Sequence, residues 1–135
     1  GIDSDCDLLD CEAASHGSSY FAACAGPMNF TMSESACQIL GYDGLASVHS
    51  LIETAFVRSL LTTGVDLAWV GLTDQDEEGT WVWTDGSAYD FDVASGTTDT
   101  GNEDCLYLTG TGANDINCNA TSNVSPIGFV CQQPN

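Results

Sequence analysis

Four carboxylates fall within five residues near the middle of this sequence. Two stretches that predict β-strands flank them: the apolar run Leu67–Leu72 and the segment Thr80–Thr84, which alternates around two tryptophans. Carboxylate oxygens are the ligands that hard cations prefer. The sequence therefore predicts a cation-binding loop held between two strands. The four acidic residues are Asp74, Asp76, Glu77 and Glu78.

The charge of the chain is strongly unbalanced. Twenty acidic residues face a single basic one, Arg58, and the formal net charge is -19. Such a surface repels phosphate backbones and anionic lipids, which excludes nucleic acid as a partner and disfavours a membrane surface. Self-repulsion also destabilises the folded state, so cations are expected to stabilise it. An alternative explanation for most of these charges is a solvated acidic surface suited to a salty exterior.

Length and cysteine content suggest a single secreted domain. A chain of 135 residues fits one domain with a modest core, and seven cysteines indicate an oxidising compartment. No apolar run reaches transmembrane length, so membrane insertion is not expected. Gly1 is not followed by a charged and then apolar leader, and we expect a mature extracellular chain.

Two helices are predicted from capping patterns. Thr31 with Glu34 predicts an N-cap and a helix that stops at Gly41, and Ser50 with Glu53 predicts a second helix that runs through Leu61 to Gly64. In the first helix the capping pattern is followed by apolar Ala36, Ile39 and Leu40. The apolar residues of the second helix are spaced for one buried face: Ile52, Phe56 and Leu60, with Val57 and Leu61 alongside.

No catalytic constellation is evident. The chain has no lysine, no G-x-S-x-G motif, and only two histidines, His16 and His49, which lie far apart in the sequence. Neither histidine has another ligand type at metal-binding spacing, so a structural role is expected for both. We therefore predict a protein that is not an enzyme.

Several motifs recur in an order that resembles the C-type lectin-like domain. WVGL at 69–72 is followed by the acidic loop and by GTWVWTDG at 79–86, while LASVHS at 45–50 precedes them. EDC at 103–105, NDINC at 114–118 and GFVC at 128–131 complete the series. Ala113 and Phe129 replace two tryptophans of the family pattern. The resemblance extends from about Ser19 to Gln133.

The resemblance implies an α+β fold in which two helices flank small, mostly antiparallel sheets. The domain would comprise residues 19–135, preceded by an acidic arm at residues 1–18. The strand Ser19–Cys24 would pair with the carboxyl-terminal strand. A long irregular loop from about Gly86 to Glu103 would carry the ligand site.

The resemblance also implies two disulfides, Cys37–Cys131 and Cys105–Cys118. For the amino-terminal cysteines, the spacing favours Cys11–Cys24, similar to an extra bridge in long-form family members, with Cys6–Cys24 as the next choice. If Cys6 is left over, it could form an intermolecular disulfide. Alternatively it is a free or capped thiol, or its partner belongs to a missing segment.

Two calcium sites follow from the same resemblance. The first would use Asp74, Glu78, Asp99 and Asp104, all carboxylates, which suits an ion with six to eight oxygen ligands. The second, which in the family also holds sugar hydroxyls, would use Glu103, Asn114 and Asp115. The proline-containing tripeptide of that site is missing, because residues 94–99 read ASGTTD. Asn114 and Asp115 could instead serve a turn of the fold without metal.

Three N-x-[ST] sequons, at Asn29, Asn119 and Asn123, predict a glycoprotein, least strongly at Asn123 because Pro126 follows. Two functions remain in competition. One is a calcium-stabilised structural or protein-binding module, extracellular and matrix-like, that associates with itself or another protein. The other is a calcium-dependent carbohydrate receptor with an atypical site. A third, mineral or ice binding, would use the threonines 97, 98, 100, 109 and 111.

Overall fold

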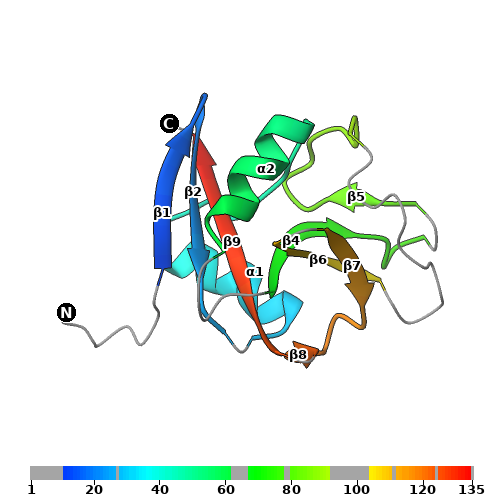
Figure 1. Cartoon of the computed structure of the whole chain (residues 1–135). Helices are drawn as coiled ribbons and strands as arrows, with labels where there is room; N and C mark the ends of the chain where they lie inside the picture. Colours follow the sequence, from blue (N-terminus) through cyan, green and yellow to red (C-terminus); the bar gives the residue numbers. More distant parts are fainter. Residues whose placement is uncertain are drawn as a thin grey trace.

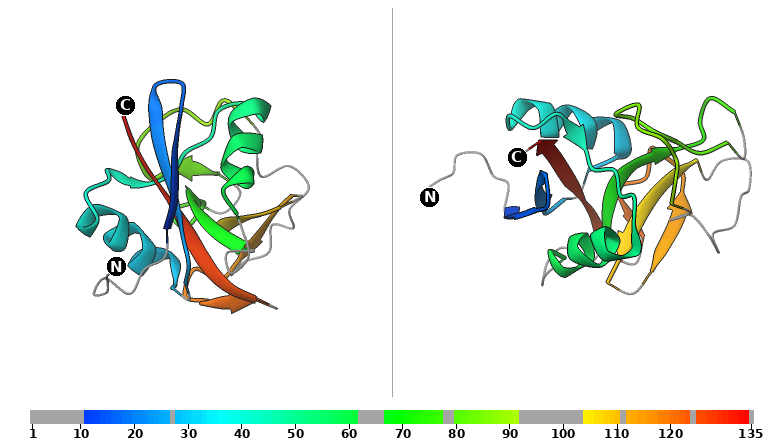
Figure 2. Two further views of the ribbon diagram at one scale, coloured as in Figure 1. Left: turned by 60° about the vertical axis from the view of Figure 1, so that its left-hand side comes forward. Right: turned by 90° about the horizontal axis from the view of Figure 1, so that it is seen from above.

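A mixed β-sheet with one helix on each face forms the molecule (Figures 1 and 2). The computed structural model describes residues 11–26, 28–61, 67–77, 80–91, 104–110, 112–123 and 125–134. The helices are α1 (Phe30–Ile39) and α2 (Leu51–Ser59). The strands are β1 (Cys11–His16), β2 (Ser19–Cys24), β3 (Gly44–Leu45), β4 (Leu67–Thr73), β5 (Val82–Trp83), β6 (Cys105–Thr109), β7 (Ala113–Ile116), β8 (Ser122–Asn123) and β9 (Ser125–Pro134).

Hydrogen bonding joins the strands in the order β1-β2-β9-β4-β6-β7, with β3 and β8 beside β9 and β5 beside β4. Only the β4–β9 pair is parallel among the described strands, with Trp69 opposite Phe129. Through this pair, the two small sheets that the sequence predicts are joined into one hydrogen-bonded sheet. The α+β class and the pairing of Ser19–Cys24 with the carboxyl-terminal strand are confirmed.

Both faces of the central strands are buried, which explains their continuous apolar runs. On β4, Leu67 and Trp69 point to the side of α1, whereas Ala68, Val70 and Leu72 point to the side of α2. Seen from above, the two helices lie on opposite sides of the sheet (Figure 2, right). Each helix therefore covers its own core.

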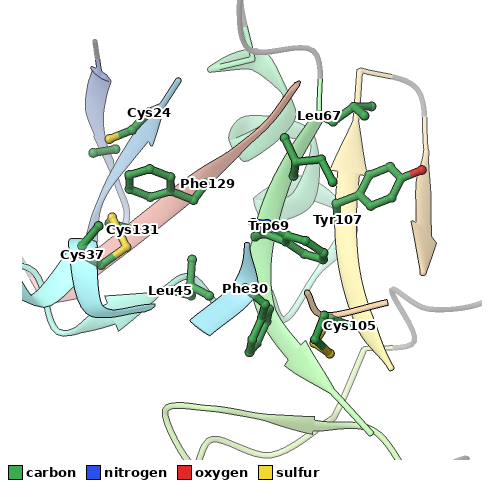
Figure 3. Close-up of a cluster of buried hydrophobic side chains, with 14 residues drawn as sticks. Cys24, Phe30, Cys37, Leu45, Leu67, Trp69, Cys105, Tyr107, Phe129 and Cys131 are labelled. Atoms are coloured by element: carbon green, nitrogen blue, oxygen red, sulfur yellow. A yellow bond between two sulfur atoms is a disulfide. The ribbon is translucent and has the colours of Figure 1, made fainter. Parts of the chain in front are cut away.

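The core beneath α1 is aromatic. The Trp69 ring makes edge contacts with Phe30 and Tyr107, with centroids 5.7 and 6.2 Å away (Figure 3). Its indole N–H donates to the carbonyl oxygen of Met28 at 2.8 Å, so the buried nitrogen is satisfied. This tryptophan ties the entry of α1 to the central sheet.

Gly71 is required where the chain crosses close to its neighbours. A Cβ at this position would lie 2.6 Å from the Thr84 hydroxyl oxygen and 3.2 Å from the carbonyl oxygen of Leu45. The same residue donates its N–H to Ala46 and accepts one from Thr84, both at 2.8 Å. The glycine of the WVGL motif thus lets β4 approach the segments on both sides.

Three disulfides fasten the described chain: Cys11–Cys24, Cys37–Cys131 and Cys105–Cys118. These are the three pairs expected from the sequence. The last two lie in the core beneath α1, where all four sulfur-bearing residues are buried (Figure 3). Cys6 lies outside the described residues, and its state stays a prediction.

Several boundaries differ from the sequence prediction. The N-cap of α1 is Asn29, not Thr31, and the predicted strand Thr80–Thr84 is reduced to β5. The helix α2 ends at Ser59, while Gly64 lies outside the described residues. Part of the predicted acidic arm at residues 1–18 forms β1 and extends the sheet through β2.

The buried face predicted for the second helix is wrong at Ile52, which is 72% exposed. On α1, the apolar side chain of Ile39 is 84% exposed. The sides that face the sheet instead use small and polar residues, Ser33 in α1 and Thr54 in α2, whose hydroxyls donate to backbone carbonyls. Neither described helix has the length or apolar character needed to cross a membrane.

Candidate functional site

Sheet pairing brings Asp74 and Asp104 together, although thirty positions separate them. Asp74 directly follows β4 and Asp104 directly precedes β6, and these strands pair with Thr73 opposite Cys105. The backbone N–H of Asp74 donates to the carbonyl oxygen of Asp104 at 2.9 Å. Two of the four carboxylates predicted for the first calcium site are thus neighbours on adjacent strands.

The environment of these carboxylates suits a hard cation. Asp74 is only 1% exposed, and Asp104 is half-buried. The Oδ1 atom of Asp104 is buried and has no hydrogen-bond partner among the described residues. A buried carboxylate oxygen without a donor is costly unless a cation neutralises it. The residues present therefore fit calcium, whose oxygen ligands include aspartate.

The rest of this predicted site lies outside the described residues, since Glu78 and Asp99 belong to segments that the structure leaves undescribed. Within the described ranges, no three histidine, cysteine or acidic side chains are grouped so as to hold a metal. The pair Asp74 and Asp104 is therefore half of the predicted ligand set.

Asn114 and Asp115 lie on β7, the strand next to β6, where they pair with Tyr107 and Leu106. They occupy a strand and not the turn that the sequence analysis named as their alternative place in the fold. Asn114 is exposed, and its Oδ1 accepts the backbone N–H of Asp115 at 2.9 Å. Asp115 is only 2% exposed. Glu103, the third predicted ligand, lies outside the described residues.

A polar network around His49 is absent from the sequence prediction. Its Nδ1 lies 2.7 Å from Asp90 Oδ1, and its Nε2 lies 3.2 Å from Ser47 Oγ and 3.1 Å from Ser87 Oγ. These residues span 43 sequence positions, and their spacing matches no motif. Only the fold brings them together, so sequence reasoning had no signal for the network.

The network has the residue types of a Ser-His-Asp triad, but its protons are used differently. Ser47 Oγ donates to Asp85 Oδ2 at 2.6 Å, and Ser87 Oγ lies 2.5 Å from Asp85 Oδ1. With both hydroxyl protons directed to Asp85, neither serine is arranged to give its proton to His49. The arrangement therefore fits the structural role predicted for His49. His16, the other histidine, stacks on Phe56 with ring centroids 4.7 Å apart.

Asp85 is held in its charged form by this network. Partial burial alone would raise its pKa, but hydrogen bonds from Ser47 and Ser87, with the nearby His49, outweigh burial. The pKa of Asp85 therefore lies below its ordinary value. This carboxylate is a fixed negative charge on the surface near β3 and β9.

Two of the three predicted glycosylation sequons become neighbours in the fold. Phe30, which follows Asn29, donates its backbone N–H to the carbonyl oxygen of Cys118, which precedes Asn119. Asn119 is exposed and Asn29 is half-buried. Asn29 Oδ1 accepts the N–H of Met32 at 2.8 Å as the N-cap of α1. Asn123 lies on β8, which begins three residues after Asn119.

A family model described as "Lectin C-type domain" matches residues 26–133. Among curated proteins, the "C-type lectin domain family 4 member M" of Symphalangus syndactylus is 30% identical over 123 residues, which is 87% of this chain and 28% of that protein. The "CD209 antigen" of Nomascus concolor is 35% identical over 92 residues, 64% of this chain and 22% of that protein. The chain spans less than a third of the length of these relatives.

Solved structures share the fold. A "calcium-independent type II antifreeze protein" superposes with a TM-score of 0.77 at 25% identity, covering 94% of this chain and 96% of the other. The "cow C-type carbohydrate-recognition domain of CD23", solved in the presence of an oligosaccharide, superposes with a TM-score of 0.78 at 24% identity and covers 91% and 93%. The similarity extends over nearly the whole chain.

Proposed function

The chain belongs to the C-type lectin domain family, and from this premise we propose that it is a calcium-stabilised, non-catalytic binding module that acts outside the cell. Its ligand would be another protein or a second copy of itself. The observation that carries the proposal is the adjacent pair of buried Asp74 and half-buried Asp104, whose carboxylates suit a hard cation.

Calcium at this position would be held by Asp74 and Asp104, with Glu78 and Asp99 as the further ligands predicted from the sequence. The ion would neutralise buried negative charge and fasten the end of β4 to the start of β6. In a chain of net charge -19 that neutralisation stabilises the folded state. Because calcium would hold the end of β4 and the start of β6 together, ligand binding by the module would depend on calcium.

Exposed apolar side chains favour a protein as the partner. Leu51 and Ile52 are 68% and 72% exposed at the start of α2, and Met32 and Ile39 are exposed on α1. Such residues supply contact area in protein interfaces. Because copies of this acidic chain repel one another, self-association would need screening salt, bridging calcium, or an intermolecular disulfide through Cys6.

Thermal unfolding in calcium and in chelator tests the proposal. Calcium at about 100 times its Kd is expected to stabilise the native protein by about 2.7 kcal/mol. Asp104→Asn should abolish this gain. Asp76→Asn, which removes the same charge from an exposed position two residues after Asp74, should retain it. Equal melting temperatures in calcium and chelator for the native chain would refute calcium stabilisation.

A second candidate is calcium-dependent carbohydrate binding by Glu103, Asn114 and Asp115. Exposed Asn114 beside buried Asp115 on β7 favours it, as does the similarity to proteins named as lectins. Glycan binding by the native chain that is lost in Asn114→Ala would favour this candidate. Light scattering without reductant, first in calcium and then in chelator, would reveal assembly and so favour the first.

The three sequons extend the proposal to a glycoprotein. Asn29 and Asn119 are neighbours, so glycans on both would cover the start of α1. The threonine face considered for ice or mineral binding is described only at Thr109, at the end of β6, because threonines 97, 98, 100 and 111 lie outside the described residues.

A further inference from the structure

A cavity of about 250 Å³, lined by both polar and apolar groups, opens between the β1–β2 hairpin and the turn after β5. It lies apart from Asp74, Asp104, Asn114 and Asp115, none of which lines it. Its volume is below the roughly 300–1,000 Å³ of sites for whole small molecules, so it fits the end of one side chain. The lining residues are Ser18, Ser19, Asp43, Gly44, Leu45, Asp85, Gln132 and Gln133.

The floor of the cavity is rigid. Gln132 on β9 accepts the backbone N–H of Ser47 at 2.8 Å through Oε1, and its Nε2 donates to Ser19 Oγ at 2.9 Å. Leu45, which is 2% exposed, adds an apolar surface that a methylene chain can contact. Both ends of the glutamine amide are thus fixed, and the cavity is formed before any ligand arrives.

The lining of the cavity is negatively charged. Asp43 and Asp85 are among the lining residues, and no basic residue is. The single basic side chain of the chain, Arg58, donates to the carbonyl oxygen of Gly112 on another part of the sheet. A cationic group is therefore the complementary ligand.

The hydrogen bonds of Asp85 decide which cation fits. Its Oδ1 already accepts the N–H and the hydroxyl of Ser87, and its Oδ2 accepts the hydroxyl of Ser47. A carboxylate has about four acceptor positions, so only one, on Oδ2, is left. A guanidinium that binds in bidentate fashion needs a free position on each oxygen, whereas an ammonium needs only one.

We propose that this cavity binds an alkylammonium group, the end of a lysine side chain or of a free amine, through Asp85 and Asp43. The 135 residues contain no lysine, so none of them can supply a lysine side chain to the cavity. The site does not depend on the proposed calcium site, because the two share no residue.

Titration of the native, oxidised chain with n-butylammonium chloride tests the proposal, with backbone amide NMR as the readout. We expect saturable shifts at Gly44, Leu45, Gln132 and Gln133, in chelator as well as in calcium. 1-Butanol should produce none of these shifts, and n-butylguanidinium should bind more weakly. Absence of saturable shifts, or equal shifts with 1-butanol, would overturn the proposal. Displacement of the ammonium by calcium would mark a metal site and overturn it too.

A matched pair of variants makes the test specific. Asp43→Asn removes one exposed carboxylate of the cavity and should weaken binding about two- to fivefold. Glu12→Gln removes the same charge from the far end of the β1–β2 hairpin and should leave binding unchanged. Equal weakening in both would indicate general attraction to an acidic surface and would contradict a defined site.

A blocked lysine, N-acetyl-lysine methylamide, distinguishes the two sources of the ammonium group. Binding equal to that of n-butylammonium assigns the cavity to lysine side chains of a partner protein. Binding of n-butylammonium alone assigns it to free amines. Either result supports the ammonium chemistry, and failure of both ligands refutes it while leaving calcium stabilisation to its own test.

Discussion

The carboxylate of Asp85 shows how three hydrogen bonds stabilise a charge that partial burial opposes. Ser47 and Ser87 supply the donors. The Nε2 atom of His49 contacts the hydroxyls of the same two serines. Because the pKa of Asp85 is lowered in the folded state, ionised Asp85 stabilises the fold at neutral pH. That stabilisation is lost as the pH falls through the folded-state pKa.

Asp85→Asn should therefore lower the free energy of unfolding at pH 7 by about 1 kcal/mol or less, since the site is partly exposed. Below about pH 4, near the unfolded-state pKa of aspartate, the difference from the native chain should shrink. Denaturant unfolding of both proteins from pH 7 to pH 3 measures this difference. A gap that is constant with pH would show that the charge of Asp85 contributes nothing.

At the residue scale, the sequence predicted neighbours where both residues belong to motifs of one family. Asp74 and Asp104 were assigned to one site because each lies in such a motif, and sheet pairing places them together. The contacts among Ser47, His49 and Asp85 depend on how a loop folds back over β3, which no local spacing encodes. The remaining predicted calcium ligands lie in segments outside the described residues.

At the scale of elements, the start of α1 shows two capping patterns in competition. The sequence offers Thr31 with Glu34, but Asn29 takes the N-cap. Glu34 is instead engaged in tertiary contacts: its carboxylate accepts the N–H of Leu45 and the hydroxyl of Thr84. Because Glu34 makes these long-range contacts, it does not form the capping box that predicted Thr31 as the N-cap.

Asn29→Ala should cost about 1 kcal/mol of stability, the usual loss of an N-cap, whereas Thr31→Ala should change it by less than about 0.5 kcal/mol. Denaturant unfolding of unglycosylated protein measures both, because each change also destroys the sequon. Asn29→Asp keeps the capping oxygen and should stay close to the native chain. A larger loss for Thr31→Ala than for Asn29→Ala would restore the cap predicted from the sequence.

Helix orientation was harder to predict than helix existence. Ile52 has the spacing of a buried face, yet the sheet contacts smaller residues, including Ser33 and Thr54. A helix that packs closely on a sheet favours small side chains at the contact, and a sequence pattern that scores only apolar residues overlooks them. The strands were predicted better, since two buried faces produce continuous apolar runs.

For the molecule as a whole, repulsion among the negative charges destabilises the fold that the cores and disulfides stabilise. The net charge of -19 acts over about 30 Å at 0.01 M salt but only about 3 Å at 1 M. The fold class and the pairing of Ser19–Cys24 with the carboxyl-terminal strand followed from motifs spread over the chain. The magnitude of this repulsion cannot be predicted from the sequence motifs, because it depends on how the carboxylates are spaced on the folded surface.

Raising sodium chloride from 0.01 to 0.5 M, with chelator present, should stabilise the chain by about 1 kcal/mol, or roughly 4 °C in Tm. Calorimetric scans at several salt concentrations measure this shift. Tetramethylammonium chloride at equal ionic strength should act similarly, since screening does not depend on the identity of the cation. A Tm that falls with salt would mean that attractive pairs outweigh repulsion.

The disulfides also set how the chain responds to mechanical tension. A pull on both ends passes from Cys11 to Cys24 through one bridge and from Cys37 to Cys131 through another. The chain between Cys37 and Cys131, whose sequence separation is 94, carries no load, and between Cys11 and Cys131 only the segment from Cys24 to Cys37 can lengthen. Its thirteen steps span at most about 45 Å. Under oxidising conditions the domain thus behaves as a nearly inextensible link, and reduction converts it into an extensible one.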